Sequence, residues 1–440
     1  MSLNNNPHTF SMKTFFQSFV FLFSVGVWGQ QWTLRQSLDY ALAHHPAMEQ
    51  SLLEVHGADR RVAMAKGELL PGVNVGLNRN YSFGSTIDPN SNSRKSLNTQ
   101  SDQLNVTVPM VLFDWRNYLN IGLSRWDKES SEYRLRSVQN EIVLNVIQAF
   151  FQYQSDKAWL EVISTQIGGV EEQIARIEQE VAIGTRPKSD VYDIKANLGT
   201  LREQWISARN QKELAKNNLF YSIGLQDEAV DFVLEDELPE SELLDRDDFV
   251  ADLLERNPLY RRALKQYQIS EKKVVLAKAD FLPRLSAVYQ WSTFYSKVLG
   301  ASVSDPFSLQ FKTNQNDWVA LGLEIPVFNR FQTKHRVGLA KLSLQNAALE
   351  KDKVVLELTK NLKAIGIQFV HAREKYAVSE ANFENQKQSF QKSEEKYKEG
   401  LLDAYTFFMV RNAWLNANFN RIKSRYDLML QSELLKIYTE

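Results

Sequence analysis

Residues 160–208 read LEVISTQIGGVEEQIARIEQEVAIGTRPKSDVYDIKANLGTLREQWISA, and two stripes of apolar side chains run through them. In both stripes the steps between apolar residues alternate between three and four, the spacing of a helix that packs along another helix. The first stripe comprises Leu160, Ile163, Ile167, Val170, Ile174, Ile177 and Val181, and the second Val191, Ile194, Leu198, Leu201, Trp205 and Ala208. Between them stands Gly184-Thr185-Arg186-Pro187-Lys188, where glycine permits a tight turn and proline can open the next helix. We therefore expect an antiparallel helical hairpin with its tip near Gly184.

The upstream helix of this hairpin is very long. No strong helix breaker occurs between Asp114 and Gly168, and Gly168-Gly169 interrupts the heptads without shifting them. About 70 residues at about 1.5 Å each would reach roughly 100 Å. A compact domain has no use for such a rod, so we expect the rod itself to serve the function.

The chain repeats itself. Two helices, at about 33–45 and 47–69, stop at His45-Pro46 and Leu70-Pro71, and the second half has helices that stop at Asn257-Pro258 and Leu282-Pro283, each 212 residues later (258 less 46, 283 less 71). Asn145 and Asn361, Gly184 and Gly400, and Pro109 and Pro326 continue the correspondence with offsets of 216, 216 and 217. This predicts a tandem duplication, with one repeat at 30–225, a linker at 226–246 and a second repeat at 247–440.

Each repeat contains two segments of alternating apolar and polar residues, at about 72–84 and 102–113 and at about 284–296 and 317–328. Alternation over about ten residues is typical of a transmembrane β-strand, and also of a soluble sheet with one wet face. The long helices and the N-terminus favour the membrane strand. Four strands cannot close a barrel, so the chain must oligomerise, and two, three or four copies would supply eight, twelve or sixteen strands.

The N-terminus reads as a secretory signal. One lysine, Lys13, precedes an apolar run from Phe15 to Trp28, and modest residues stand before Gln30. We expect a cleavable signal peptide over residues 1–29, with Met12 as an alternative start, and an uncleaved anchor as the competing interpretation. No run of eighteen apolar residues follows Gln30.

Composition argues against several functions. The chain has 52 basic and 53 acidic residues and no basic stripe, which argues against nucleic acid as a partner. It has no cysteine and six histidines without ligand spacing, so we expect no metal site and no cofactor. Without a phosphate loop or nucleophile elbow, we expect no enzyme.

From about Gln30 to Tyr438 the chain resembles the TolC-like family of outer-membrane efflux proteins. The resemblance rests on the duplicated His/Asn-Pro and Leu-Pro stops, on strands that end at Val108-Pro109 and Ile325-Pro326, and on the tips AIGTRPKSDV at 182–191 and YKEGLLDA at 397–404. It implies a homotrimer in the outer membrane, with a twelve-stranded barrel continued by twelve helices as a long periplasmic tunnel. It also implies docking of a periplasmic adaptor and an inner-membrane transporter at the tips.

The candidate site residues fall into three groups. Adaptor-docking residues at the tips are Gly184, Thr185, Arg186, Gly400, Leu401 and Leu402; candidates for the periplasmic gate are Asp190, Asp193 and Tyr397; and membrane-interface aromatics are Tyr289, Trp291, Tyr295 and Trp318. The resemblance implies a link from an acid at the position of Asp190 to a tyrosine, matched by Tyr397, and to an arginine, whose place Leu402 takes. We therefore expect that link to be incomplete. The alternatives are solvated carboxylates at a helix N-terminus and ordinary packed aromatics.

The resulting expectation is a mainly helical fold with two long hairpins and four membrane strands per chain. Its function would be a passive exit duct for small toxic molecules. An exit duct for type I protein secretion fits the same fold, and a periplasmic coiled-coil scaffold without a barrel is the alternative from another class.

Overall fold

The computed structural model describes residues 31–87, 91–96, 98–225, 230–234, 254–300 and 304–439. The expected signal peptide lies outside the described residues. So do most of the expected linker and most of the helix expected just before Asn257.

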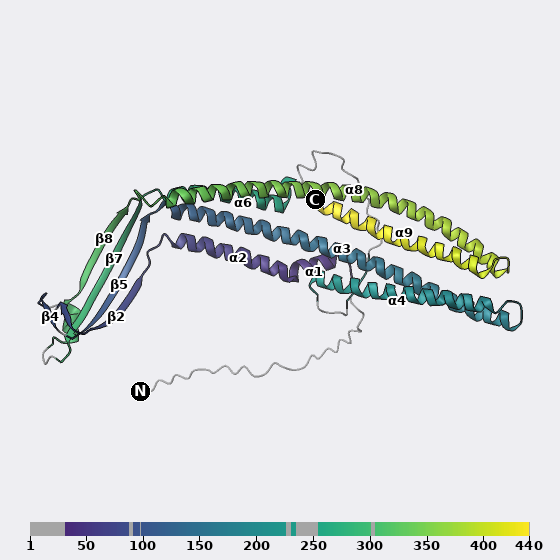
Figure 1. The fold of residues 1–440 in the computed structure, drawn as a ribbon, viewed down its shortest axis with the longest axis horizontal. Coiled ribbons are helices and arrows are strands. Elements are labelled where there is room, and N and C mark those ends of the chain that lie inside the picture. Colours follow the sequence, from purple (N-terminus) through teal and green to yellow (C-terminus); the bar gives the residue numbers. More distant parts are fainter. Residues whose placement is uncertain are drawn as a thin grey trace, which may run out of the picture.

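The molecule is an elongated rod with a β-sheet at one end and two helical tips at the other (Figure 1). Its long hairpins are α3 (Trp115–Ala182) with α4 (Ser189–Ile223), and α8 (Gln332–Lys398) with α9 (Ala404–Thr439). With 68 residues, α3 is about 100 Å long at about 1.5 Å per residue, which confirms the expected rod. The shorter helices are α1 (Leu34–His44), α2 (Pro46–Gly67), α6 (Pro258–Ala279) and α7 (Phe307–Thr313).

The duplication is visible element by element. Helices α2 and α6 have 22 residues each, and both begin with proline. The preceding side chain caps both: His45 Nδ1 accepts from the Ala47 amide at 3.2 Å, and Asn257 Oδ1 accepts from the Leu259 amide at 2.9 Å. A polar N-cap followed by proline is a strong helix start, so the two repeats share one local signal.

The four long strands form one antiparallel sheet in the order β2-β5-β7-β8. Their bounds are β2 (Asn74–Ser82), β5 (Thr99–Phe113), β7 (Arg284–Val298) and β8 (Asn316–Glu324). The four expected strands are therefore present, and their ends differ from the expected ones by up to four residues. A small hairpin of β3 (Ser85–Ile87) and β4 (Arg94–Ser96) lies in the first loop, and α7 lies in the second.

The register gives this sheet one apolar and one polar face. Val75 faces Val106, Leu77 faces Leu104 and Tyr289 faces Val319 across neighbouring strands. The alternate positions pair Asn74 with Thr107 and Gln290 with Trp318. Val75, Leu77, Val319 and Leu321 are each exposed by more than two thirds in the single chain. An exposed apolar face on this scale marks a surface that contacts a protein partner or a membrane.

The hairpins are held by apolar side chains along their seams. Ile163, Val170, Ile177 and Ile194 are completely buried between α3 and α4, at the positions that the heptad spacing predicts. Near the tips the core also includes Tyr397, Phe407, Phe408 and Leu415 from the second hairpin, so one cluster joins both hairpins.

At mid-length, two short strands tie the chain together. Strand β1 (Gln31–Trp32) pairs in parallel with β6 (Asp231–Phe232), which falls inside the expected linker. Tyr153 donates to Asp231 at 2.6 Å, and Lys157 Nζ lies 2.9 Å from the same carboxylate. Among the described residues, no helix combines the length and the apolar character needed to cross a membrane.

Candidate functional site

The first tip is a tight turn that requires glycine. Helix α3 ends at Ala182, and Gly184 has a φ of 79°, in the left-handed region that glycine adopts at low cost. The Thr185 amide and hydroxyl both donate to the Glu180 carbonyl, at 2.9 and 2.8 Å. These bonds satisfy carbonyl groups that the end of the helix leaves open.

The second tip repeats this geometry. Gly400 has a φ of 74°, and the Leu401 amide donates to the Lys396 carbonyl at 2.8 Å. Asp403 then caps α9, accepting from the Thr406 amide at 2.9 Å and from its hydroxyl at 2.7 Å. Both tips are therefore tight turns that are closed by hydrogen bonds to the ends of their helices.

Arg186 joins the two tips. Its Nη2 donates to the Tyr397 carbonyl at 2.8 Å, and its guanidinium lies 4.6 Å from the centre of the Tyr397 ring. Its Nε lies 2.6 Å from Glu180, and its Nη1 lies 3.4 Å from Asp190. With only 13% of its side chain exposed, Arg186 is occupied inside the protein, so its expected role as an adaptor contact has little surface to act through.

Tyr397 lies in the centre of this contact. The residue is 1% exposed, and its ring stacks on Phe407 with centroids 4.4 Å apart. Burial raises the pKa of the Tyr397 hydroxyl, and this oxygen has no hydrogen-bond partner among the described residues. The stacked Phe407 ring and the Arg186 guanidinium hold the Tyr397 ring in place.

The structure separates the two acids of the expected gate. Asp190 is mostly covered and lies beside Arg186, whereas Asp193 is exposed. The sequence predicts an incomplete link, because Leu402 takes the place of the arginine that the resemblance implies. In the structure Leu402 packs against the apolar cluster, and a different arginine, Arg186 of the first tip, lies beside Asp190, four residues before it in the chain. The sequence signal for the pairing of Arg186 with Asp190 is their spacing of four residues.

Several exposed apolar residues of the tips were not singled out from the sequence. Leu401 is 71% exposed at the second tip. Ile183, next to Gly184 in the first tip, and Tyr405, four residues after Leu401, are each 76% exposed. The exposure of these residues could have been predicted from the sequence, because they fall outside the steps of three and four that mark the side chains buried between the helices.

Three of the four interface aromatics share one face of the sheet. Tyr289, Trp291 and Tyr295 alternate along β7 on the apolar face, and Tyr289 donates to Asp317 at 2.7 Å. Trp318 lies on the polar face, opposite Gln290, because it is one residue out of step with Val319. The apolar face also carries an ion pair that the sequence did not reveal: Arg79 Nε lies 2.6 Å from Asp102 Oδ1 on the neighbouring strand.

Within the described residues, no three histidine, aspartate or glutamate side chains gather in a way that could hold a metal ion.

Comparison with known proteins places these features in a family. The Outer membrane efflux protein family matches residues 37–225 and 249–437, the two repeats. The solvent efflux pump outer membrane protein SrpC of Pseudomonas putida is 24% identical over 322 residues, covering 68% of this chain and 63% of SrpC. OprJ of Pseudomonas aeruginosa is 21% identical over 328 residues, covering 71% of this chain and 64% of OprJ. The chain thus spans less than two thirds of the length of these curated relatives.

Solved structures show the same fold. The CmeC outer membrane channel of Campylobacter jejuni superposes with a TM-score of 0.76 at 17% identity, covering 92% of this chain and 85% of CmeC. VceC of Vibrio cholerae gives 0.75 at 15% identity, with 92% and 95% covered. With both repeats matched and the fold shared over nearly its whole length, the chain belongs to the outer membrane efflux protein family.

Proposed function

We propose that three copies of this chain form an outer-membrane duct through which small toxic molecules leave the cell. The observation that carries the proposal is the sheet: its apolar face is uncovered, and β2 and β8 are its two edges. Unpaired strand edges cost several kcal/mol per group in lipid, so the edges must pair with other copies. Four strands per chain make twelve in a trimer, above the known minimum of about eight.

The dimensions of the apolar face suit a membrane. Along β7 it runs from Leu285 to Thr293, about 27 Å at about 3.4 Å per residue. At a tilt of about 40° this spans about 20 Å, close to the apolar band of about 25 Å found in outer-membrane barrels. Asp317, opposite Trp291, and the Arg79–Asp102 ion pair, opposite Tyr295, lie toward its outer end, where headgroups begin.

The helices offer a matching contact between copies. In the tip half the order across the wall is α4-α3-α9-α8, and in the sheet half it is α2-α3-α6-α8, so α8 is always one edge. Leu342, Leu349 and Leu356 on α8 recur every seven residues and are exposed by more than 60% each. At the other edge, Leu53 and Met64 on α2 and Ile206 on α4 are also exposed. Such stripes pack well against each other, so a ring of copies buries all of them.

The tips would then form the periplasmic mouth. Arg186 holds the two hairpins of one copy together there, which supports a mouth that rests closed. Exposed Ile183, Leu401 and Tyr405 at the far end supply an apolar surface for a periplasmic adaptor, which in turn would connect an inner-membrane transporter. Two relatives support this proposal: SrpC is named as the outer membrane protein of a solvent efflux pump, and OprJ is named as an outer membrane protein.

The experiment is to break the contact between copies. Leu349→Glu places a charge in the exposed α8 stripe and should yield monomers in detergent, whereas Ser343→Glu, on another face of the same helix, should leave the trimer intact. Native mass spectrometry of the purified mature protein measures both. A trimer that tolerates Leu349→Glu as well as Ser343→Glu would contradict the proposed packing.

A further inference from the structure

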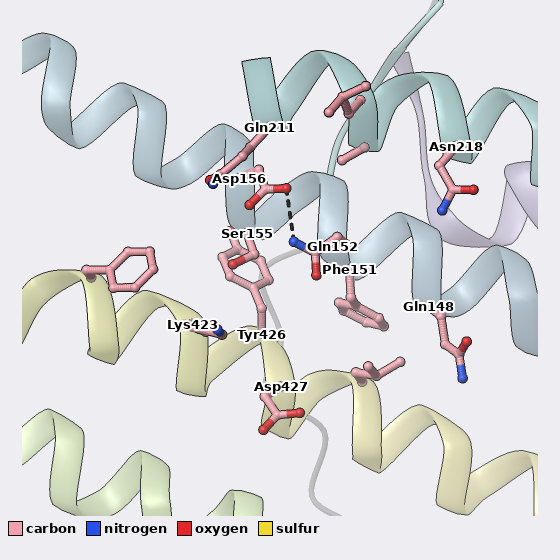
Figure 2. Close-up of a pocket in the computed structure, with 14 residues that line it drawn as sticks. Gln148, Phe151, Gln152, Ser155, Asp156, Gln211, Asn218, Lys423, Tyr426 and Asp427 are labelled. Carbon is pink, nitrogen blue, oxygen red and sulfur yellow. Dashed lines mark hydrogen bonds between the residues drawn. The ribbon is translucent and has the colours of Figure 1, made fainter. Parts of the chain in front are cut away.

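A cavity of about 590 Å³ lies between α3, α4 and α9 (Figure 2). Its size falls within the range of about 300–1,000 Å³ that is typical of small-molecule sites. Gln148, Gln152 and Asp156 line it from α3, Asn218 from α4, and Tyr426 and Asp427 from α9.

The cavity opens on the opposite side of α3 from the short strands at mid-length. Phe150 packs against Phe232 of β6, with ring centroids 6.2 Å apart. Gln148 and Gln152 are each two residues from Phe150, about 200° around the helix at about 100° per residue. Helix α3 therefore separates the cavity from β1 and β6.

In the proposed trimer, this side faces the channel. Three copies of α1, β1 and β6 would obstruct an open duct if they lay inside it, so they must lie outside. The cavity then faces inward, and three copies of it surround the duct at one level. This step depends on the proposed function.

The walls of the cavity combine negative charge with aromatic rings. Asp156 and Asp427 contribute two carboxylates, and Lys423 contributes one ammonium group. The rings of Phe151, Phe419 and Tyr426 also line the cavity. Aromatic faces attract cations, and they pack against apolar groups.

Asp156 lies partly buried in this wall, near Lys423. Gln152 donates to it at 3.0 Å, and burial raises the pKa of the Asp156 carboxyl. A carboxylate that has lost part of its water gains more from a nearby cation than a fully hydrated one does.

We propose that this cavity binds hydrophobic organic cations, molecules with one positive charge and aryl or alkyl groups, as they pass along the duct. The carboxylates hold the charge and the rings hold the apolar groups, while the amide side chains keep the site wet enough for the molecule to leave.

A pair of probes with the same shape and opposite charge tests this directly. The mature trimer in lipid nanodiscs is equilibrated by dialysis with tetraphenylphosphonium or with tetraphenylborate, and binding to empty nanodiscs is subtracted. We expect saturable binding of the cation and weaker binding of the anion.

Substitutions locate the binding. Asp156→Asn and Asp427→Asn keep the side-chain size and should each weaken cation binding by about fivefold, and Lys423→Gln should strengthen it. Asp59→Asn on α2 removes one charge far from the cavity and should change nothing.

Equal binding of the two probes, or cation binding that ignores Asp156→Asn and Asp427→Asn, would overturn the inference. Failure of the proposed function would look different, because the protein would then not enter nanodiscs as a trimer or conduct ions in planar bilayers.

Discussion

Arg186 bonds to both helical hairpins at the tips, through Glu180 and Asp190 in the first and the Tyr397 carbonyl in the second. Arg186→Ala removes its bonds to Glu180, Asp190 and the Tyr397 carbonyl, and charge-assisted bonds of this kind are worth about 2 kcal/mol. In a closed mouth, this would shift the open-to-closed ratio by about 30-fold. We expect higher single-channel conductance in planar bilayers with the trimer intact.

Two further variants control this prediction. Lys188→Ala removes an exposed tip cation and should leave conductance unchanged, and Arg186→Lys keeps the charge without the fork and should be intermediate. If Arg186→Ala behaves like Lys188→Ala, Arg186 does not hold the mouth.

The two acids of the tip are expected to differ. Asp190→Ala removes the partner of Arg186 and should raise conductance, whereas Asp193 is exposed and Asp193→Ala alone should have the smaller effect. The double variant should be the leakiest. Unchanged conductance in the double variant would mean that both are simply solvated carboxylates near a helix N-terminus.

Sequence reasoning named Arg186, Asp190 and Tyr397 but did not bring Arg186 and Tyr397 together. The bond between them joins residues 211 positions apart, and local spacing carries no information on such a contact. The acid at i+4 from Arg186 was visible, whereas the tyrosine became a partner only once the two hairpins were packed side by side.

At the scale of elements, periodic patterns predicted what is long and regular. The heptad stripes located α3 and α4, and the alternating segments located all four membrane strands. The parallel pair of β1 and β6 was missed, because two-residue strands carry no pattern and their partners are about 200 positions apart. Likewise α7, with seven residues, is set by its contacts with β7: Gln310 donates to the Ser296 carbonyl and accepts from its amide, both at 3.0 Å.

The tips are expected to act as docking elements. Ile183→Asp combined with Leu401→Asp replaces two exposed apolar side chains and should abolish adaptor-dependent resistance to toxic compounds, with trimer assembly unchanged. Thr200→Asp, on the exposed face of α4 away from the tip, is the control. Resistance that survives the double substitution would refute docking through these side chains.

The mid-length network should make stability depend on acid pH. Burial alone would raise the pKa of Asp231, but the bonds from Tyr153 and Lys157 hold it below its usual range. A carboxylate with a lowered pKa stabilises the fold above its unfolded pKa of about 3.9, and this contribution is lost as the pH falls through the folded pKa. The thermal midpoint of wild type should therefore fall more steeply below about pH 4 than that of Asp231→Asn, and equal slopes would argue against the network.

At the scale of the whole molecule, a single chain leaves strand edges unpaired and apolar surface uncovered. Its sheet leaves an apolar face and two strand edges open, and its helical wall leaves apolar stripes at both edges. Closing the sheet around three copies, as we propose, would satisfy both at once, so the proposed barrel and the proposed helical tunnel depend on the same oligomer.

The measurement that tests this most directly is native mass spectrometry of the mature protein released from lipid nanodiscs, paired with conductance in planar bilayers. We predict one species with the mass of three chains that inserts and conducts ions. A monomer that stays in solution without detergent and leaves bilayers unchanged would contradict the account.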